Sequence, residues 1–220
     1  MFDIPGPEEF AIKAAVIAVM LLVAFPIHEF AHALAAFRLG DGTARLMGRL
    51  TLNPFAHFDQ IGGLLLAITV MFTSFGFGWA KPTPYNPMNL QGGRWGEALV
   101  AVAGPISNLV LAIAAAVPLR YMDAVGMNVP LLGLFLEFFV SINLVLMVFN
   151  LIPIPPLDGS KVLFAFMGPQ TVWRVRPVLE QYGFVILLAA MLLPLFGGLT
   201  VIDVVFVEVL RPLQHVLTGR

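Results

Sequence analysis

The sequence predicts an all-α integral membrane protein. We expect a multi-span helical bundle of about four to six membrane segments, forming one membrane-embedded domain over residues 1–220, with a re-entrant or hairpin element beside its functional site. Composition is the first indication: 59% of the 220 residues are hydrophobic, only 11% are charged, and the mean hydropathy is +0.91. Soluble domains have about 45–50% apolar and about 25% charged residues. The second indication is that the apolar residues gather in uncharged runs.

These uncharged runs set the number of expected membrane segments. They cover residues 14–27 (continuing past a polar cluster to position 37), 60–80, 98–119, 138–157 and 183–202. A helix that crosses a bilayer needs about 20 predominantly apolar residues, and all but the second run meet this requirement. The second run ends in a segment rich in glycine and aromatic residues, 75–79. It is therefore the segment that either spans or re-enters the membrane.

The basic residues of the loops favour re-entry. If the second run dips in and returns, one side of the membrane holds eight basic residues and the opposite loop only Arg120; if every run crosses, this bias cancels. The eight are Arg38, Arg45, Arg49, Lys81, Arg94, Lys161, Arg174 and Arg176. Because basic loops stay in the cytoplasm, we expect a multi-pass protein of the cell (plasma or inner) membrane, with its N-terminus outside and these loops cytoplasmic.

Net charge and cysteine content argue against nucleic-acid binding and against sites built on cysteine. The formal net charge of -1 gives no reason to expect a nucleic-acid partner. The chain has no cysteine, so a disulfide framework and a thiolate metal site are both excluded. Any transition metal would have to be held by histidine and carboxylate side chains.

One such set stands in the first apolar run, where His28-Glu29-Phe30-Ala31-His32 matches H-E-x-x-H. On a helix, histidines four residues apart project from one face toward one zinc ion, and the glutamate serves as general base. A chance match anywhere in the chain has a probability of about 0.2% at this composition. Each ionisable side chain inside a bilayer costs about 2.5–3.5 kcal/mol, so three of them in five residues need a compensating role. The alternative is a polar cluster that joins helices by hydrogen bonds, which requires neither this spacing nor the glutamate.

A catalytic zinc ion needs a third protein ligand and keeps a fourth position for water. Among the remaining acids, Asp158 alone stands at the edge of an apolar run within a rigid segment, Asn150-Leu151-Ile152-Pro153-Ile154-Pro155-Pro156-Leu157-Asp158-Gly159. The three prolines remove backbone donors and break the helix, which fixes the direction of the chain. This favours Asp158 as the third ligand. The alternative is that Asp158 caps a helix that begins at Gly159.

Together these segments make the chain resemble the site-2 protease family of intramembrane zinc metalloproteases. The resemblance rests on residues 28–32, on residues 150–159, which match the family's N-x-x-P-x-P-x-L-D-G segment, and on Gly104-Pro105-Ile106-Ser107-Asn108 between them. The chain looks most like short members without a PDZ or CBS domain. These also carry Leu52-Asn53-Pro54 with His57 and Asp59, then Gly78-Trp79-Ala80-Lys81-Pro82.

The resemblance implies one zinc ion (Zn²⁺) per chain, bound by His28, His32 and Asp158, with Glu29 as the catalytic base. It also implies hydrolysis of transmembrane protein substrates within the lipid bilayer, as in regulated intramembrane proteolysis, and a membrane-embedded strand or hairpin near the site. The remaining alternatives are a membrane zinc transporter or metal-sensing protein, which would need ligands that release metal to both sides, and an inactive relative that binds membrane helices.

Some polar residues are weaker candidates. Asn150 and Asn108 stand in apolar runs, where each would support substrate binding or the transition state, or hydrogen-bond two helices. We expect the Gly104-Pro105 pair to kink a helix or permit close packing. His57 with Asp59 is expected in a loop rather than in a second metal site, and His215 at the membrane interface.

Overall fold

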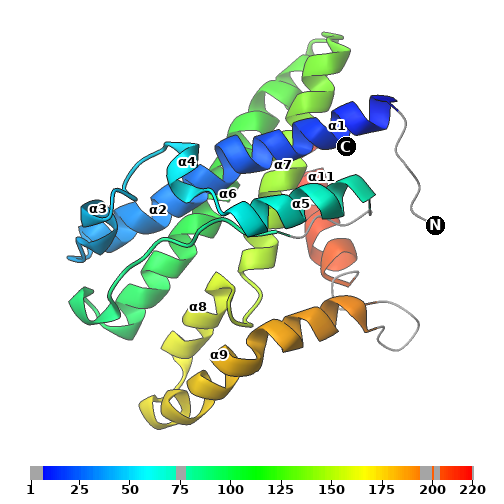
Figure 1. Cartoon of the computed structure of the whole chain (residues 1–220). Helices are drawn as coiled ribbons and strands as arrows, with labels where there is room; N and C mark the ends of the chain where they lie inside the picture. The colour runs from blue at the N-terminus through cyan, green and yellow to red at the C-terminus, as the bar shows by residue number, and fades with distance from the viewer. Residues whose placement is uncertain (1–6, 73–77, 194–199, 201–203, 220) are drawn as a thin grey trace.

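The computed structural model describes residues 7–72, 78–193, 200 and 204–219 of the chain (Figure 1). These residues form helices joined by loops, with no strand among them. The helices are α1 (Pro7–Val19), η1 (Met20–Ala24), α2 (Phe25–Arg38), α3 (Thr43–Leu46), α4 (Pro54–His57), α5 (Gln60–Phe72), η2 (Pro87–Asn89), α6 (Arg94–Ala124), α7 (Pro130–Asn150), α8 (Asp158–Phe166), α9 (Pro169–Leu192), η3 (Phe206–Leu210) and α11 (Arg211–Thr218). The predicted all-helical class is confirmed.

Three helical stretches in the described part of the chain are long and apolar enough to cross a membrane. They are Phe10–Arg38, which joins α1, η1 and α2 into one long helix, and the helices α6 and α7. With 31 residues, α6 extends for about 46 Å, more than the hydrocarbon layer of about 30 Å. The predicted run 183–202 begins in the last part of α9, and most of its second half lies outside the described residues.

The second apolar run forms a short helix from which the chain turns back. With 13 residues, α5 is about 20 Å long, too short to cross the hydrocarbon layer. A Cβ on Gly62 would lie 2.1 Å from the carbonyl oxygen of Trp79, so residue 79 lies against this helix. The backbone N–H of Lys81 donates to the carbonyl of His57 at 2.8 Å. The chain has thus turned back to the start of α5. The distribution of basic residues in the loops predicts such a re-entrant segment.

Small residues hold the central helices together. Ala112, Ala115 and Ala116 of α6 pack against Val140 and Leu144 of α7, and all of these side chains are buried. Since lipid is as apolar as these side chains, helices in a membrane associate through close packing, which alanine and glycine permit. The α6–α7 pair forms the largest buried cluster of the described residues.

The same α6 helix supports both segments that carry the candidate ligands. It packs against α2 on one side and against α8 on another. At its N-terminal end, Glu97 is buried and accepts two hydrogen bonds from Arg176 of α9, at 3.0 and 2.9 Å. This bidentate ion pair ties α9 to α6, so α6 fixes the relative positions of α2, α8 and α9.

Candidate active site

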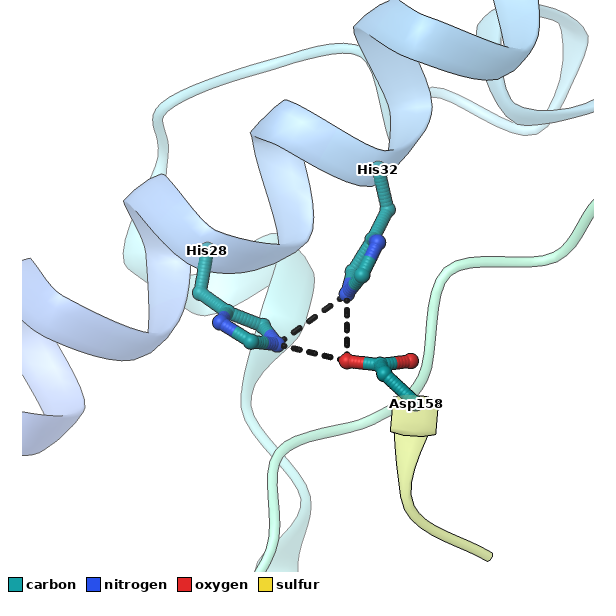
Figure 2. A group of neighbouring side chains, drawn as sticks. All are labelled: His28, His32 and Asp158. Carbon is teal, nitrogen blue, oxygen red and sulfur yellow. Dashed lines mark hydrogen bonds and ion pairs between the residues drawn. The ribbon is translucent and has the colours of Figure 1, made fainter. Parts of the chain in front are cut away.

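The helix α2 places His28 and His32 on one face, as their spacing predicts (Figure 2). Both side chains are buried, and their rings meet edge to face with centroids 4.6 Å apart. The two Nε2 atoms approach within 3.0 Å. They therefore point at the same small volume beside the helix.

Asp158 reaches this volume from the other side of the cluster (Figure 2). Its Oδ2 lies 3.3 Å from Nε2 of His28 and 3.1 Å from Nε2 of His32. In the described part of the chain, these three residues are the one group of three or more His, Cys, Asp and Glu side chains close enough to share a metal ion.

The alternative role of Asp158 as a helix cap does not fit the structure. The helix α8 begins at Asp158 itself, its N-cap residue is Leu157, and no side chain caps it. The turn after α7 is held close to this helix by Gly159, where a Cβ would lie 2.2 Å from the carbonyl oxygen of Leu151. The start of α8 thus directs the Asp158 side chain toward α2 rather than toward its own backbone.

Hydrogen bonds at Nδ1 fix the ring orientation and the tautomer of each histidine. Nδ1 of His32 lies 2.7 Å from the carbonyl oxygen of Val100 on α6. A carbonyl oxygen only accepts hydrogen bonds, so this nitrogen donates, and in the neutral ring Nε2 then carries the free lone pair. A lone pair at Nε2 is what a metal ion requires.

His28 is oriented by a chain of two asparagines. Asn143 donates from Nδ2 to the carbonyl of Phe139 at 2.8 Å, which turns its Oδ1 toward Asn108. Asn108 donates to that oxygen at 3.0 Å, and its own Oδ1 faces Nδ1 of His28 at 2.6 Å. Nδ1 must therefore donate, and Nε2 of His28 also presents a lone pair to the cluster.

A helix-helix contact brings α6 directly against the two rings. A Cβ on Gly104 would lie 2.4 Å from Nε2 of His32 and 2.6 Å from Nε2 of His28, so only glycine fits. The expectation that the Gly104-Pro105 pair permits close packing is confirmed. The packing partner, which the sequence does not indicate, is the cluster itself.

Glu29 is half-buried and is held by an extended segment that follows α5. The backbone N–H of Thr83 donates to its Oε2 at 2.7 Å, and Oγ1 of Thr83 donates to the backbone carbonyl of Glu29 at 2.9 Å. Thr83 stands between Pro82 and Pro84, which have no N–H. The single backbone donor of this Pro-Thr-Pro sequence is thus used on the predicted base.

Comparison with known proteins shows the family of the chain. A model of "Peptidase family M50" matches residues 127–192. A Bacillus subtilis (strain 168) protein named "Putative zinc metalloprotease YwhC" is 39% identical over 184 residues, which cover 81% of each chain. The chain belongs to peptidase family M50, the site-2 protease family. The resemblance predicted from the motifs is therefore confirmed.

Two mycobacterial relatives of this M50 chain are also named as zinc metalloproteases. Each is named "Putative zinc metalloprotease Rip2", one from Mycolicibacterium smegmatis and one from Mycobacterium tuberculosis (strain H37Rv), and each is 32% identical, over 174 and 180 residues. The matches cover 79% and 80% of this chain, and 65% and 66% of the relatives. No solved structure matches.

A cavity of about 580 Å³ opens onto the cluster of the M50 chain. The residues His28, Glu29, His32 and Asp158 all line it, and Leu66 of α5, Trp79, Phe149 of α7 and Leu187 of α9 add apolar walls. Asn150 also lines the cavity, and its Nδ2 donates to the carbonyl of Leu146 at 2.9 Å. Asn150 is thus part of the cavity wall, and its role toward a substrate stays a prediction.

The other predicted candidates do not line the cavity. Asn108 is completely buried and does not line the cavity, so we propose that it orients His28 instead of contacting substrate. His57 was expected in a loop but is the buried last residue of the short helix α4, with Nε2 2.8 Å from the carbonyl of Thr51. Oδ1 of Asp59 accepts a hydrogen bond from the backbone N–H of Gly62. His215 is exposed on α11. No group of ligating side chains forms around either histidine within the described residues.

We expect Asn108→Ala to weaken zinc binding by about 10–100-fold, because partners that orient metal-bound histidines contribute affinity of this size. The zinc dissociation constant of the purified protein checks this. The matched control is Asn128→Ala, which removes an exposed asparagine from the loop before α7. Equal affinities of Asn108→Ala and wild type would show that the asparagine chain does not orient His28.

Proposed function

We propose that this chain is an intramembrane zinc metalloprotease, which hydrolyses peptide bonds within or near the transmembrane segments of membrane proteins, as in regulated intramembrane proteolysis. The observation that carries this proposal is the convergence of His28, His32 and Asp158 beside Glu29 in one cavity between apolar helices. Residues 1–220 would act as one membrane-embedded metalloprotease domain.

The spacing of the donor atoms fits zinc. In a tetrahedral site with metal–ligand distances of about 2.0–2.1 Å, ligand atoms are about 3.3 Å apart. The three pairwise distances here are 3.0, 3.3 and 3.1 Å. Two neutral histidine nitrogens and one carboxylate oxygen form a donor set typical of catalytic zinc, which uses three protein ligands. We therefore propose one zinc ion per chain, held by these three residues.

Bound there, zinc would polarise the scissile carbonyl and lower the pKa of water. Glu29 would take the proton of the attacking water and pass it to the leaving amine. The N–H of Thr83 fixes Oε2 of Glu29, so the carboxylate does not have to be ordered during the reaction. From the cavity wall, Asn150 would hydrogen-bond the substrate backbone.

A transmembrane substrate has to be unwound locally before it can be cut, because helical hydrogen bonds occupy its carbonyl groups. The extended segment 78–86 follows the edge of the cavity with Trp79, Ala80 and Thr83 among the lining residues. We propose that an unwound substrate lies along this segment, which takes the place of the strand or hairpin that the family resemblance implies.

Removal of zinc tests the proposed function directly. In liposomes that contain a single-pass membrane substrate, a chelator should abolish cleavage, and one equivalent of zinc per chain should restore it. Magnesium should not restore it, since this ion prefers oxygen ligands in octahedral geometry. Undiminished cleavage by the metal-free protein would contradict the proposal.

We also propose an orientation for the chain. The return of the chain after α5 supports a topology in which the basic residues of the 38–94 region lie on the same side as those of the 158–182 region. By the positive-inside rule, both sets would then lie in the cytoplasm beside a plasma or inner membrane. Cysteines introduced at Arg45 and Arg174 should both be labelled from the cytoplasmic side, and one at Asp123 from outside. Labelling of positions 45 and 174 from opposite sides would contradict this topology.

A further inference from the structure

Lys161 is the only lysine or arginine among the described residues that line the cavity. It follows Asp158 by three positions, on the first turns of α8. Its Nζ donates to Oδ1 of Asp158 at 3.2 Å, and the lysine side chain keeps 27% of its surface exposed. Nothing in the H-E-x-x-H or N-x-x-P-x-P-x-L-D-G pattern assigns a function to this position.

The two oxygens of Asp158 have different partners. Oδ2 faces the histidines, at 3.3 and 3.1 Å, whereas Oδ1 is occupied by the ammonium group of Lys161. An exposed pair at this helical spacing adds little to the stability of a helix. Here the carboxylate is buried, so its free oxygen would need a partner in any case. The ion pair therefore bears on the geometry of the cluster more than on the stability of α8.

The ammonium group has a second contact, with Tyr85. Nζ of Lys161 lies 5.5 Å from the centre of the Tyr85 ring, within the range of a cation–π contact. Tyr85 belongs to the same extended segment as Thr83, which stands two residues before it. Thr83 is the residue that hydrogen-bonds Glu29. This segment contacts the predicted base directly and the third ligand through Lys161.

We propose that Lys161 is a positioning residue that keeps Asp158 a one-oxygen ligand. With Oδ1 engaged by lysine, Asp158 offers only Oδ2 to zinc, which leaves one position of a four-coordinate ion for a ligand from outside the protein. Without lysine, both oxygens are free to bind the ion. This inference rests on the proposed function for its consequence in catalysis, but the geometry of the metal site tests it separately.

The experiment replaces zinc by Co²⁺, whose visible absorption reports coordination number and geometry. Wild type and Lys161→Arg should show a four-coordinate spectrum. Lys161→Met should show the weaker spectrum of a five-coordinate ion, and should cleave about 10–100-fold more slowly, as for other losses of partners to metal ligands. Arg174→Met is the control, because Arg174 is exposed on α9 and does not line the cavity; its spectrum should equal that of wild type.

A four-coordinate spectrum in Lys161→Met would overturn the proposal. So would identical changes in Lys161→Arg and Lys161→Met, since the site would then require the shape of lysine and not its charge. If no variant cleaves but the cobalt spectra differ as expected, the role of Lys161 stands and it is the proposed protease function that fails.

Discussion

Replacing Gly104 by alanine should remove zinc from the protein and reduce cleavage by about 10²-fold or more. The added methyl group would lie 2.4 and 2.6 Å from the Nε2 atoms of His32 and His28, too close for either ring to stay in place. Misplacement of catalytic groups by about 1 Å is enough to cost about 10²-fold in rate. Zinc content measured by mass spectrometry, together with the rate of substrate cleavage, checks this expectation.

The fold itself should survive this substitution. Alanine favours a helix over glycine by about 1 kcal/mol, so the change does not weaken α6 intrinsically. Gly133→Ala in α7 is the matched control, because a Cβ at Gly133 meets nothing within 4 Å. It should keep zinc and activity. A Gly104→Ala protein that retains full zinc would show that the contact between α6 and the histidine rings is looser than the structure indicates.

Much of the candidate site could be predicted because its signals are local. Because His28 and His32 are four residues apart, any helix places them on one face, and the prolines before Asp158 indicate a turn of fixed direction. The return of the chain after α5 was predicted from the glycine- and aromatic-rich end of the second apolar run and from the positions of the basic residues. The first two inferences use residues near one another in the chain, and the third needs only a count of charges in the loops, so none of them requires knowledge of packing.

The supporting contacts could not be predicted in the same way because they join distant segments. Thr83 is 54 positions from Glu29, and Asn108 is 80 positions from His28. The apolar run around Asn108 showed that its amide needs a partner, but only the packing of α2 against α6 selects His28. Lys161 is different: its spacing of three from Asp158 was a local signal for an ion pair, although only the cavity shows which oxygen it engages.

The second large effect concerns Glu29. The Glu29→Gln protein should keep zinc but cleave a single-pass membrane substrate about 10²–10⁴-fold more slowly, the usual cost of losing a general base. Glutamine retains an oxygen that can accept the Thr83 N–H, so the extended segment should stay in place. Zinc content, zinc flux in liposomes and peptide release, all measured on one preparation, check this expectation.

This comparison also separates the protease from its alternatives, because each alternative uses Glu29 differently. A zinc transporter has no proton to deliver to a leaving amine, so its flux would follow zinc affinity and be similar in wild type and Glu29→Gln. An inactive relative would bind membrane helices equally well with either residue and release no peptide. The control, Glu137→Gln, removes a carboxylate from α7 that does not line the cavity, and it should leave cleavage unchanged. Cleavage by Glu29→Gln at the wild-type rate would exclude Glu29 as the base, and zinc flux without cleavage in both proteins would favour transport.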